Sequence, residues 1–332
     1  MNDVALVIPA RNAERTLDAC LRAVVPLLDR ELREIVVVDD GSTDATAAIA
    51  ARFPVRVVHG SGEGPSRARN LGWRTTAAEL VWFVDADCVA EAGALPPLLE
   101  LIERTGCAGA GGTYTNASPE SWLATAIDDE IAVRHAAMVE SVDYLATFDV
   151  MYRREVLEKV GGFDESLVRA EDVDLAWRIL AAGGELRFTP RSRVAHFHEE
   201  RVLPYLRTQA ANGYWRTWLY ASHPEHAGGD SYSSWVDHMP PVLALAALGA
   251  AALAPWWPTA GLAGLAAAST AALQWPMARD LSARRNPSHG AAFAVLATAR
   301  ALARGLGLAL GAGAVAWHRL HHRTQTSEGR TG

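Results

Sequence analysis

The chain has 332 residues, which is enough for one full catalytic domain and an additional segment. Its formal net charge of −7 leaves no globally basic surface, which argues against a nucleic-acid-binding protein. Cys20, Cys88 and Cys107 have neither paired nor ligand-like spacing, which argues against a disulfide framework and a zinc site. The N-terminus lacks a basic stretch followed by an apolar one, so we expect no secretory signal and a first region that stays in the cytosol.

The first 110 residues alternate strand and helix signals. Continuous apolar runs predict strands buried on both faces, at 4–8, 34–38, 55–58 and 80–84. Apolar residues at helical spacing predict a helix over 17–28, a second one capped by Ser42 or Thr43 that continues through Ala51, and a third from Pro65. This alternation predicts an α/β fold, with a mostly parallel sheet and helices on both of its faces.

Polar and acidic residues follow each of these predicted strands, in the segments 9–12, 39–42, 59–62 and 85–87. In open α/β sheets, ligands bind beyond the carboxyl ends of the strands, near a switch point in strand order. We therefore predict the functional site at this edge of the sheet.

Asp85 and Asp87 directly follow a predicted strand. Two carboxylates at this spacing can share a divalent cation such as Mg²⁺ or Mn²⁺, which prefers oxygen ligands. Such a cation would neutralise the charge that develops on a nucleoside diphosphate leaving group. A solvated turn is the alternative explanation.

The second strand end carries Asp39 and Asp40, where a carboxylate can accept a hydrogen bond from a base or a ribose. Helix capping explains Ser42 to Asp44 without a ligand, but it does not explain two adjacent carboxylates that repel each other. In the glycine-rich loop before Asn70, Arg67 and Arg69 could face a diphosphate or a base, and a surface turn is the alternative.

A third acidic group begins a predicted helix, at Glu171, Asp172 and Asp174. The helix dipole alone favours acids there, but a carboxylate that reaches a sugar hydroxyl can also act as a general base. His196 and His198 follow a predicted strand at 193–195, and one of these imidazoles could complete a cation site. A structural histidine is the alternative.

Taken in this order, these pieces resemble the family 2 glycosyltransferases with the GT-A fold. The matching segments are 7–12, 35–44, 64–72, 83–87, and 161–164 leading to 171–175, and the resemblance covers about residues 3–220. It implies an inverting, metal-dependent glycosyltransferase of the hexosyltransferase type, which moves one sugar from a nucleotide-sugar donor to an acceptor hydroxyl.

The resemblance also assigns roles to individual residues. Asp172 corresponds to the general base, and the metal ligands would be Asp87 most directly, with Asp85 and His196. The positions that would bind the nucleotide sugar are Pro9, Ala10, Arg11, Asn12, Asp40, Arg69, Asp85 and Glu171. Arg11 stands where many members carry Tyr, so any stacking on the base must come from a guanidinium. The Gln-x-x-Arg-Trp motif of processive synthases is missing, because Trp215 and Arg216 come in the reverse order, which favours transfer of a single sugar.

The composition changes after Asp237, and no charged residue occurs from Met239 to Ala278. A membrane span needs about 20 apolar residues, so this stretch can hold two, with a turn at 255–258. We predict a catalytic domain over 1–237, a membrane helical hairpin over 238–280, and an amphipathic or third membrane helix with a basic tail over 281–332. The alternative is a soluble helical hairpin packed on the enzyme.

Arginines follow the second leg of the hairpin, at 279, 284 and 285. The bias of basic residues toward the cytoplasm places the catalytic domain on the cytoplasmic side of the cell membrane. The expected partners are a nucleotide-sugar donor, a lipid-linked or cell-envelope glycan acceptor, and the membrane, with no nucleic acid. Alternatives are a nucleotidyltransferase, which would not need the acidic helix start and the downstream His196, and a non-catalytic scaffold, which would not need Asp85, Asp87 and Asp172.

Overall fold

The computed structural model describes residues 3–226, 228–233, 235–252 and 257–328. The chain divides into two compact units, residues 1–198 and 199–332. The predicted catalytic domain extends to 237, beyond the first unit, because the segment after 198 forms a helix that packs within the second unit. A compact unit need not coincide with a functional domain, so the extent 1–237 stays a prediction.

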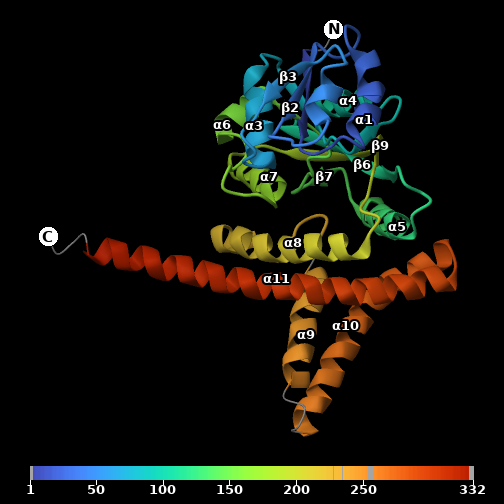
Figure 1. Cartoon of the computed structure of the whole chain (residues 1–332), viewed down its shortest axis with the longest axis vertical. Helices are drawn as coiled ribbons and strands as arrows, with labels where there is room; N and C mark the ends of the chain where they lie inside the picture. Colours follow the sequence, from blue (N-terminus) through green and yellow to red (C-terminus); the bar gives the residue numbers. More distant parts are fainter. Residues whose placement is uncertain (1–2, 227, 234, 253–256, 329–332) are drawn as a thin grey trace. The chain divides into compact units, whose positions relative to one another are not determined.

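The first unit is built around one sheet, which has nine strands among the described residues. The strands are β1 (Val4–Ala10), β2 (Glu34–Asp39), β3 (Arg56–His59), β4 (Leu80–Val84), β5 (Cys88–Ala90), β6 (Gly109–Asn116), β7 (Ser141–Val142), β8 (Asp149–Arg153) and β9 (Leu186–His196). Their order in space is β3-β2-β1-β4-β8-β6-β9-β5, and β7 pairs with β9 (Figure 1). β1 lies between β2 and β4, so the strand order switches at β1. The chain adds β2 and β3 on one side of β1 and then returns to add β4 on the other side.

The two halves of the sheet differ in strand direction. β3, β2, β1 and β4 are parallel, as the apolar runs predict. β8 is antiparallel to both β4 and β6, β6 is parallel to β9, and β5 and β7 are antiparallel to β9. The α/β fold is confirmed, and the parallel arrangement holds for the first half, while the sheet as a whole is mixed because the chain between β4 and β8 does not form a simple βαβ unit.

Helices cover both faces of the sheet, as predicted. They are α1 (Leu17–Val24), α2 (Thr46–Ala50), α3 (Pro65–Thr75), α4 (Leu95–Thr105), α5 (Trp122–Ala137), α6 (Arg154–Val160) and α7 (Glu171–Ala181). On one face, Leu6 and Ile8 of β1 pack in a core with α1 and α4. On the other face, Val7 packs in a second core with α3 and α7. Successive side chains of a strand point to opposite faces, so a strand between two cores must be apolar throughout.

Two predicted helices differ in their limits. The helix predicted over 17–28 ends at Val24 and continues as a short 3₁₀ turn, η1 (Val25–Leu27), which contains Pro26. The next helix begins at Thr46 and not at Ser42 or Thr43, because those two residues bind the loop after β1. The predicted helix start at Pro65 is confirmed.

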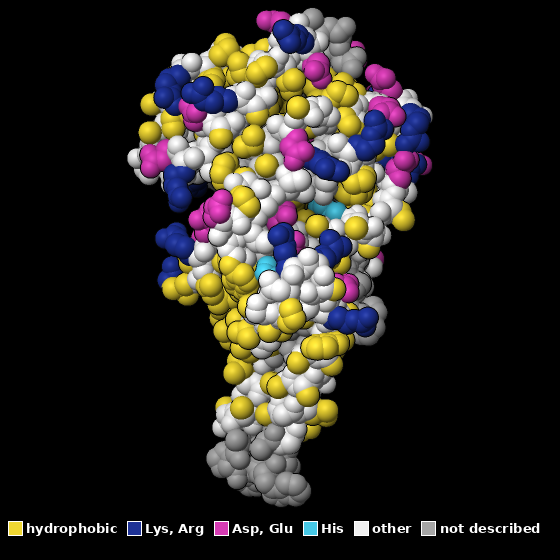
Figure 2. All heavy atoms as spheres, turned by 90° about the vertical axis from the view of Figure 1, so that its right-hand side faces the viewer, with side chains coloured by type: hydrophobic (Ala, Val, Ile, Leu, Met, Phe, Trp, Pro, Cys, Tyr) yellow, Lys and Arg dark blue, Asp and Glu magenta, His cyan; other side chains and the backbone are white. Residues whose placement is uncertain are grey.

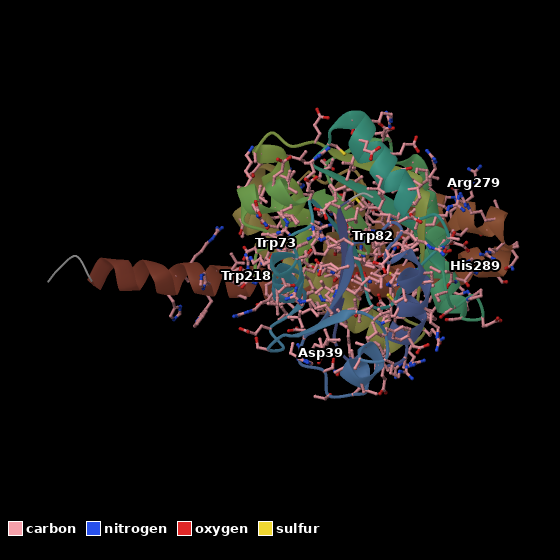
Figure 3. All side chains as sticks on the ribbon, turned by 90° about the horizontal axis from the view of Figure 1, so that it is seen from above. Asp39, Trp73, Trp82, Trp218, Arg279 and His289 are labelled. Atoms are coloured by element: carbon pink, nitrogen blue, oxygen red, sulfur yellow. The ribbon has the colours of Figure 1, made fainter. Side chains whose placement is uncertain are left out.

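A buried carboxylate ties the two halves of the sheet together. Asp149 of β8 accepts hydrogen bonds from the Trp82 Nε1 of β4 at 2.8 Å and from the Ser192 Oγ of β9 at 2.6 Å. Trp82 lies in the middle of the strands (Figure 3). Burial raises the pKa of Asp149 to about 6, and the two donors oppose this shift. A side chain at Gly112 has no room, because an added Cβ would lie 1.9 Å from Asp149 Oδ2.

The second unit is helical. It contains α8 (Val202–Ser222), η2 (Pro224–His226), α9 (Trp235–Ala252), α10 (Trp257–Arg284) and α11 (Pro287–Glu328). α9 and α10 lie side by side, and α11 crosses both and packs along α8 (Figure 1). α8 and α11 approach closely at glycines, since a Cβ added at Gly213 or Gly307 would lie 2.1 Å from the Arg304 carbonyl oxygen or 1.9 Å from the Ala210 carbonyl oxygen.

The predicted hairpin over 238–280 corresponds to α9 and α10, and part of its predicted turn, 253–256, lies outside the described residues. Among the described helices, only α11, over Pro287–His321, is long and apolar enough to cross a membrane. The core helix of a soluble protein meets the same criterion. Figure 2 shows hydrophobic side chains gathered on the second unit. The exposed apolar side chains of α10 include Leu262, Leu265 and Trp275.

Candidate active site

The loops after β1 and β2 are hydrogen-bonded to each other. Asn12 has a φ of +51°, and its side-chain oxygen accepts a hydrogen bond from the Thr43 backbone N at 2.9 Å. The Asn12 backbone N donates to Ser42 Oγ at 3.0 Å. Arg11, with an exposed side chain, reaches the loop after β3 and donates to the Gly62 carbonyl at 2.9 Å. The predicted nucleotide-sugar positions 9–12 therefore lie at one edge of the sheet, where hydrogen bonds join the loops that follow β1, β2 and β3.

The structure explains the paired carboxylates at the end of β2 without a ligand. Asp40 is 4% exposed and accepts backbone hydrogen bonds from Gly62 at 2.9 Å, Glu63 at 3.2 Å and Gly64 at 2.9 Å. Asp39 accepts from the Ser42 backbone N at 3.2 Å. Internal partners thus compensate both charges, so the repulsion between them is no evidence for a bound base. The predicted role of Asp40 in base recognition stays a prediction.

Arg69 links two distant acidic segments. It is 4% exposed, and each of its two terminal nitrogens donates a hydrogen bond of 2.7 Å. Nη1 donates to Glu171 Oε1, and Nη2 donates to Asp85 Oδ1. The guanidinium also lies over the ring of Phe163, at 5.7 Å from its centroid. Burial opposes the charged guanidinium, but Asp85 and Glu171 raise the pKa of Arg69 above its ordinary value. The residues after β4 and at the start of α7 therefore both contact the buried guanidinium of Arg69.

Arg67, in contrast, points away from this bridge. It pairs with Glu63 in the loop before its helix, its side chain is half exposed, and its Nε lies 4.0 Å from Glu165. The buried position belongs to Arg69, the arginine that the family resemblance selects, whereas the residue pattern alone treats Arg67 and Arg69 alike.

Asp87 and His196 come together because β5 runs antiparallel to the end of β9. Cys88 and His196 are direct partners in this pairing, and the Phe197 backbone N donates to the Asp87 carbonyl at 2.9 Å. The His196 Nε2 lies 3.5 Å from Asp87 Oδ2, and the Cys88 Sγ lies 3.8 Å from Asp87 Oδ1. Of the three predicted metal ligands, the structure brings Asp87 and His196 together, whereas Asp85 pairs with Arg69.

Asp87 and His196 stabilise each other's charged forms. Burial raises the pKa of Asp87, but the imidazole of His196 outweighs this effect and leaves the pKa below its ordinary value. Burial likewise disfavours charged His196, and Asp87 nevertheless raises its pKa. A carboxylate oxygen and an imidazole nitrogen at this spacing fit a divalent cation such as Mn²⁺, which would replace the imidazole proton.

His198, the second candidate histidine, lies behind His196. The two Nδ1 atoms are 2.8 Å apart, and the Nε2 of His198 lies 3.7 Å from Asp128 Oδ1 of α5. His198 is buried, and both imidazoles contact the ring of Tyr114 in T-shaped arrangements. An imidazole that binds a metal through one nitrogen is commonly oriented by a hydrogen bond at its other nitrogen. His198 is placed to orient His196 in this way, at the Nδ1 atom.

Asp172 lies in the first turn of α7, directly after Ala170 and Glu171. Its Oδ2 accepts a hydrogen bond from the Tyr144 hydroxyl at 3.1 Å, and its Oδ1 accepts from the Val173 backbone N at 2.8 Å. Burial, and then the neighbouring Glu171, raise the pKa of Asp172 to about 7. A carboxyl group with such a pKa is well matched to proton transfer near neutral pH. The sequence did not reveal Tyr144, because it lies in a loop without a local motif.

The loop around Gly162 is held by α3. Asn70 accepts a hydrogen bond from the Phe163 backbone N at 2.9 Å and donates to the Phe163 carbonyl at 2.8 Å, while Trp73 Nε1 donates to Asn70 at 2.9 Å. These bonds place Phe163 beneath the guanidinium of Arg69. The glycine pair that the sequence singled out thus supports the site rather than contacting its centre.

The two adjacent glycines of this loop, Gly161 and Gly162, should differ in how much a side chain destabilises the protein. Gly161 and Gly162 both have positive φ, +82° and +76°, but an added Cβ meets nothing within 4 Å at Gly161, whereas at Gly162 it would lie 2.4 Å from Asn70 Oδ1. We expect Gly161→Ala to cost about 1 kcal/mol of stability through backbone strain, and Gly162→Ala to cost at least ~2 kcal/mol more. Thermal or denaturant unfolding of both variants measures the difference. Equal losses would contradict the role of the Asn70 contact.

A family model for "Glycosyl transferase family 2" matches residues 5–161. The chain belongs to glycosyltransferase family 2. This family 2 chain is 30% identical over 252 residues to the pre-mycofactocin glycosyltransferase of Mycobacterium tuberculosis. The aligned region covers 70% of the chain and 52% of that relative. It is 28% identical over 195 residues to glycosyltransferase AglE of Haloferax volcanii, covering 56% of the chain and 64% of the relative. The chain thus spans about half to two-thirds of the length of these curated relatives.

The fold comparison agrees with the family. The mannosyltransferase PcManGT from Pyrobaculum calidifontis, solved in complex with GDP-Man and Mn²⁺, superimposes with a TM-score of 0.59 at 18% sequence identity. The match covers 92% of this family 2 chain and 86% of that protein. It confirms the predicted GT-A fold followed by a C-terminal helical region.

Proposed function

We propose that the chain transfers one sugar, of the hexose type, from a nucleoside-diphosphate donor to an acceptor hydroxyl, with inversion at the anomeric carbon. The observation that carries this proposal is the bridge from Arg69 to Asp85 and Glu171. This bridge joins the segment that holds Asp87 to the segment that holds Asp172, which supports a diphosphate site and a base at one edge of the sheet. The solved relative binds GDP-Man and Mn²⁺, which is consistent with such a donor and cation.

The transfer is a single displacement. The acceptor hydroxyl attacks the anomeric carbon while Asp172 takes its proton, and the bond from that carbon to the diphosphate breaks. A divalent cation held by Asp87 and His196 would stabilise the charge on the departing diphosphate. Tyr144, which donates to Asp172 Oδ2, orients this carboxylate toward the acceptor. The backbone at 9–12, with Arg11, supplies the surface for the nucleoside.

Removal of divalent cations tests the proposal. We expect a panel of nucleotide sugars to include one donor from which the chain releases nucleoside diphosphate, and we expect EDTA to abolish this release. Excess Mn²⁺ or Mg²⁺ should restore it in the native chain, whereas Asp87→Asn should lose most of the response to metal. Glu103→Gln, which changes an exposed carboxylate on α4, serves as the control. Undiminished release in EDTA would contradict the cation site.

We propose that the α9–α10 hairpin inserts into the membrane and that α11 lies along its surface, although α11 is the one described helix that is long and apolar enough to be a single span. The two assignments belong together, because α11 crosses the hairpin, so the three helices cannot all span one bilayer in parallel (Figure 1). Exposed apolar side chains on α10, among them Leu262, Leu265 and Trp275, support burial in lipid. The cytoplasmic face would then hold residues 1–237, and the acceptor would be a lipid-linked or cell-envelope glycan.

Fractionation tests this location. We expect the full chain to sediment with membranes after alkaline washing and to require detergent for extraction, because a hairpin in lipid resists high pH and salt. A chain that ends at residue 237 is the comparison and should be released by the same wash. Full-length protein that is soluble and monodisperse without detergent would overturn the membrane assignment.

A further inference from the structure

We propose that Cys88 is a third protein ligand of the cation site formed by Asp87 and His196, and that this site therefore also binds thiophilic divalent cations such as Zn²⁺ and Cd²⁺. The inference rests on the cation site of the proposed function. The inference adds one ligand, the thiol of Cys88, and one class of cation. A site that only holds Mg²⁺ or Mn²⁺ for a diphosphate requires neither of them.

The pairing of β5 with β9 places the thiol. Cys88 and His196 are opposite each other in this antiparallel pair, so their side chains point to the same face of the sheet. Asp87 precedes Cys88, and its carbonyl accepts from the Phe197 backbone N, which holds the turn against the end of β9. One ligand atom from each of Asp87, Cys88 and His196 can be chosen so that all three lie within 4.8 Å of one another.

The spacing fits a small tetrahedral cation. With typical zinc–ligand bond lengths, the edges of a tetrahedron are ~3.6 Å between sulfur and oxygen and ~3.4 Å between nitrogen and oxygen. The structure has 3.8 Å between Cys88 Sγ and Asp87 Oδ1, and 3.5 Å between His196 Nε2 and Asp87 Oδ2. These two distances end at different oxygens of Asp87, so rotation of its carboxylate together with small side-chain shifts would bring one oxygen to both partners, and one ligand atom of each residue already lies within 4.8 Å of the others.

The other cysteines do not have this arrangement. The Sγ of Cys20 lies 3.8 Å from the backbone carbonyl of Asp85, and Cys107 lies in the segment between α4 and β6. Within the part of the chain that the structure describes, Asp87, Cys88 and His196 form the one group of His, Cys, Asp or Glu side chains with metal-compatible spacing. The side chain of Asp87 is 47% exposed, so a cation can enter past it although the thiol is buried.

The consequence is a site with two modes of binding. A Zn²⁺ or Cd²⁺ ion would take the thiolate, the imidazole and the carboxylate, and the thiol proton would pass to solvent as the sulfur–metal bond forms. Three protein ligands leave one position of a tetrahedral shell for a diphosphate oxygen. Mg²⁺ instead requires a nearly octahedral shell of oxygen ligands and would leave the thiol protonated. Thiophilic cations should therefore compete with Mg²⁺ or Mn²⁺ at this position.

Cadmium absorption is the direct test. The full chain, purified in detergent without metal, is titrated with Cd²⁺ alone, and the ultraviolet charge-transfer band of a cadmium–thiolate bond is recorded. We expect one equivalent to saturate the band in the native chain and in the control Cys20→Ser. In Cys88→Ser the band should disappear and the affinity for Cd²⁺ should fall by at least about tenfold, because loss of a ligand costs no less than loss of its hydrogen-bonded support.

The native chain alone keeps the test decisive if Cys88→Ser does not fold. The ¹¹³Cd NMR shift of cadmium bound to native protein distinguishes a site with one sulfur ligand from a site with oxygen and nitrogen only. A shift typical of oxygen and nitrogen ligands, or a charge-transfer band that Cys20→Ser abolishes, would overturn the inference. Donor turnover without a thiolate band contradicts only this inference, whereas a thiolate band without turnover of any donor contradicts only the proposed function.

Discussion

Replacing Asp172 by Asn is expected to lower sugar transfer by about 10²- to 10⁴-fold while the affinity for the nucleotide-sugar donor stays unchanged. The amide keeps the size of the carboxyl group and an oxygen that can accept from the Val173 backbone N. It cannot take the proton of the acceptor hydroxyl. Donor affinity from calorimetry and turnover from nucleoside diphosphate release separate the two effects. Asp164→Asn, which changes an exposed carboxylate in the loop before α7, is the control.

The pH dependence gives this prediction a second measurement. Because the pKa of Asp172 is raised to about 7, the base is protonated below this value, and native transfer should fall about tenfold for each pH unit further down. The residual activity of Asp172→Asn should lack this slope. A variant that retains native turnover, or the same slope in both proteins, would show that another group is the base.

The same shift makes a prediction about stability. A carboxyl group with a raised pKa in the folded protein binds its proton more tightly when folded than when unfolded, so ionisation destabilises the fold. Native protein should therefore lose stability as the pH rises from about 4 to about 7, between the model value of 3.8 and the raised value. Asp172→Asn should not show this loss and should melt higher than the native chain above pH 7. A functional carboxylate is thus kept at the expense of stability.

Much of the fold follows from local sequence patterns. β4 has the predicted limits at 80 and 84, because a strand with a core on each face must be apolar throughout. β5 has only three residues and β6 begins with Gly109, so neither has a pattern long enough to predict. Their places depend on pairing with β9, about 75 to 110 residues later in the chain, which no local signal specifies.

The candidate site divides in the same way. The sequence predicts which polar side chains stand at the sheet edge, because these follow apolar strands. It does not predict which partner neutralises each charge. Asp40 is compensated by amides of the loop after β3, and Asp85 by Arg69, and both pairings depend on tertiary packing. Cysteine spacing alone indicates no metal site, and it is the pairing of β5 with β9 that brings Cys88 to His196.

The bridge at Arg69 leads to the second large effect. Arg69→Met is expected to destabilise the first unit by about 3–5 kcal/mol, because it leaves the buried carboxylate of Glu171 and the partly buried one of Asp85 without their cation. Arg67→Met is the matched control on the same helix. Its side chain is 51% exposed and pairs with Glu63, so its loss should cost about 0–1 kcal/mol. Denaturant unfolding of the two variants measures the contrast.

The double variant Arg69→Met with Glu171→Gln separates stability from catalysis. Neutralising Glu171 removes the unpaired buried charge, so part of the lost stability should return. Transfer should nevertheless stay roughly a hundredfold below native, because the end of β4 and the start of α7 are no longer held together, and a displacement of about 1 Å between base and leaving group has an effect of this size. If Arg69→Met unfolds like Arg67→Met, the bridge does not organise the site. If the double variant regains native turnover, the guanidinium acts only by compensating Glu171.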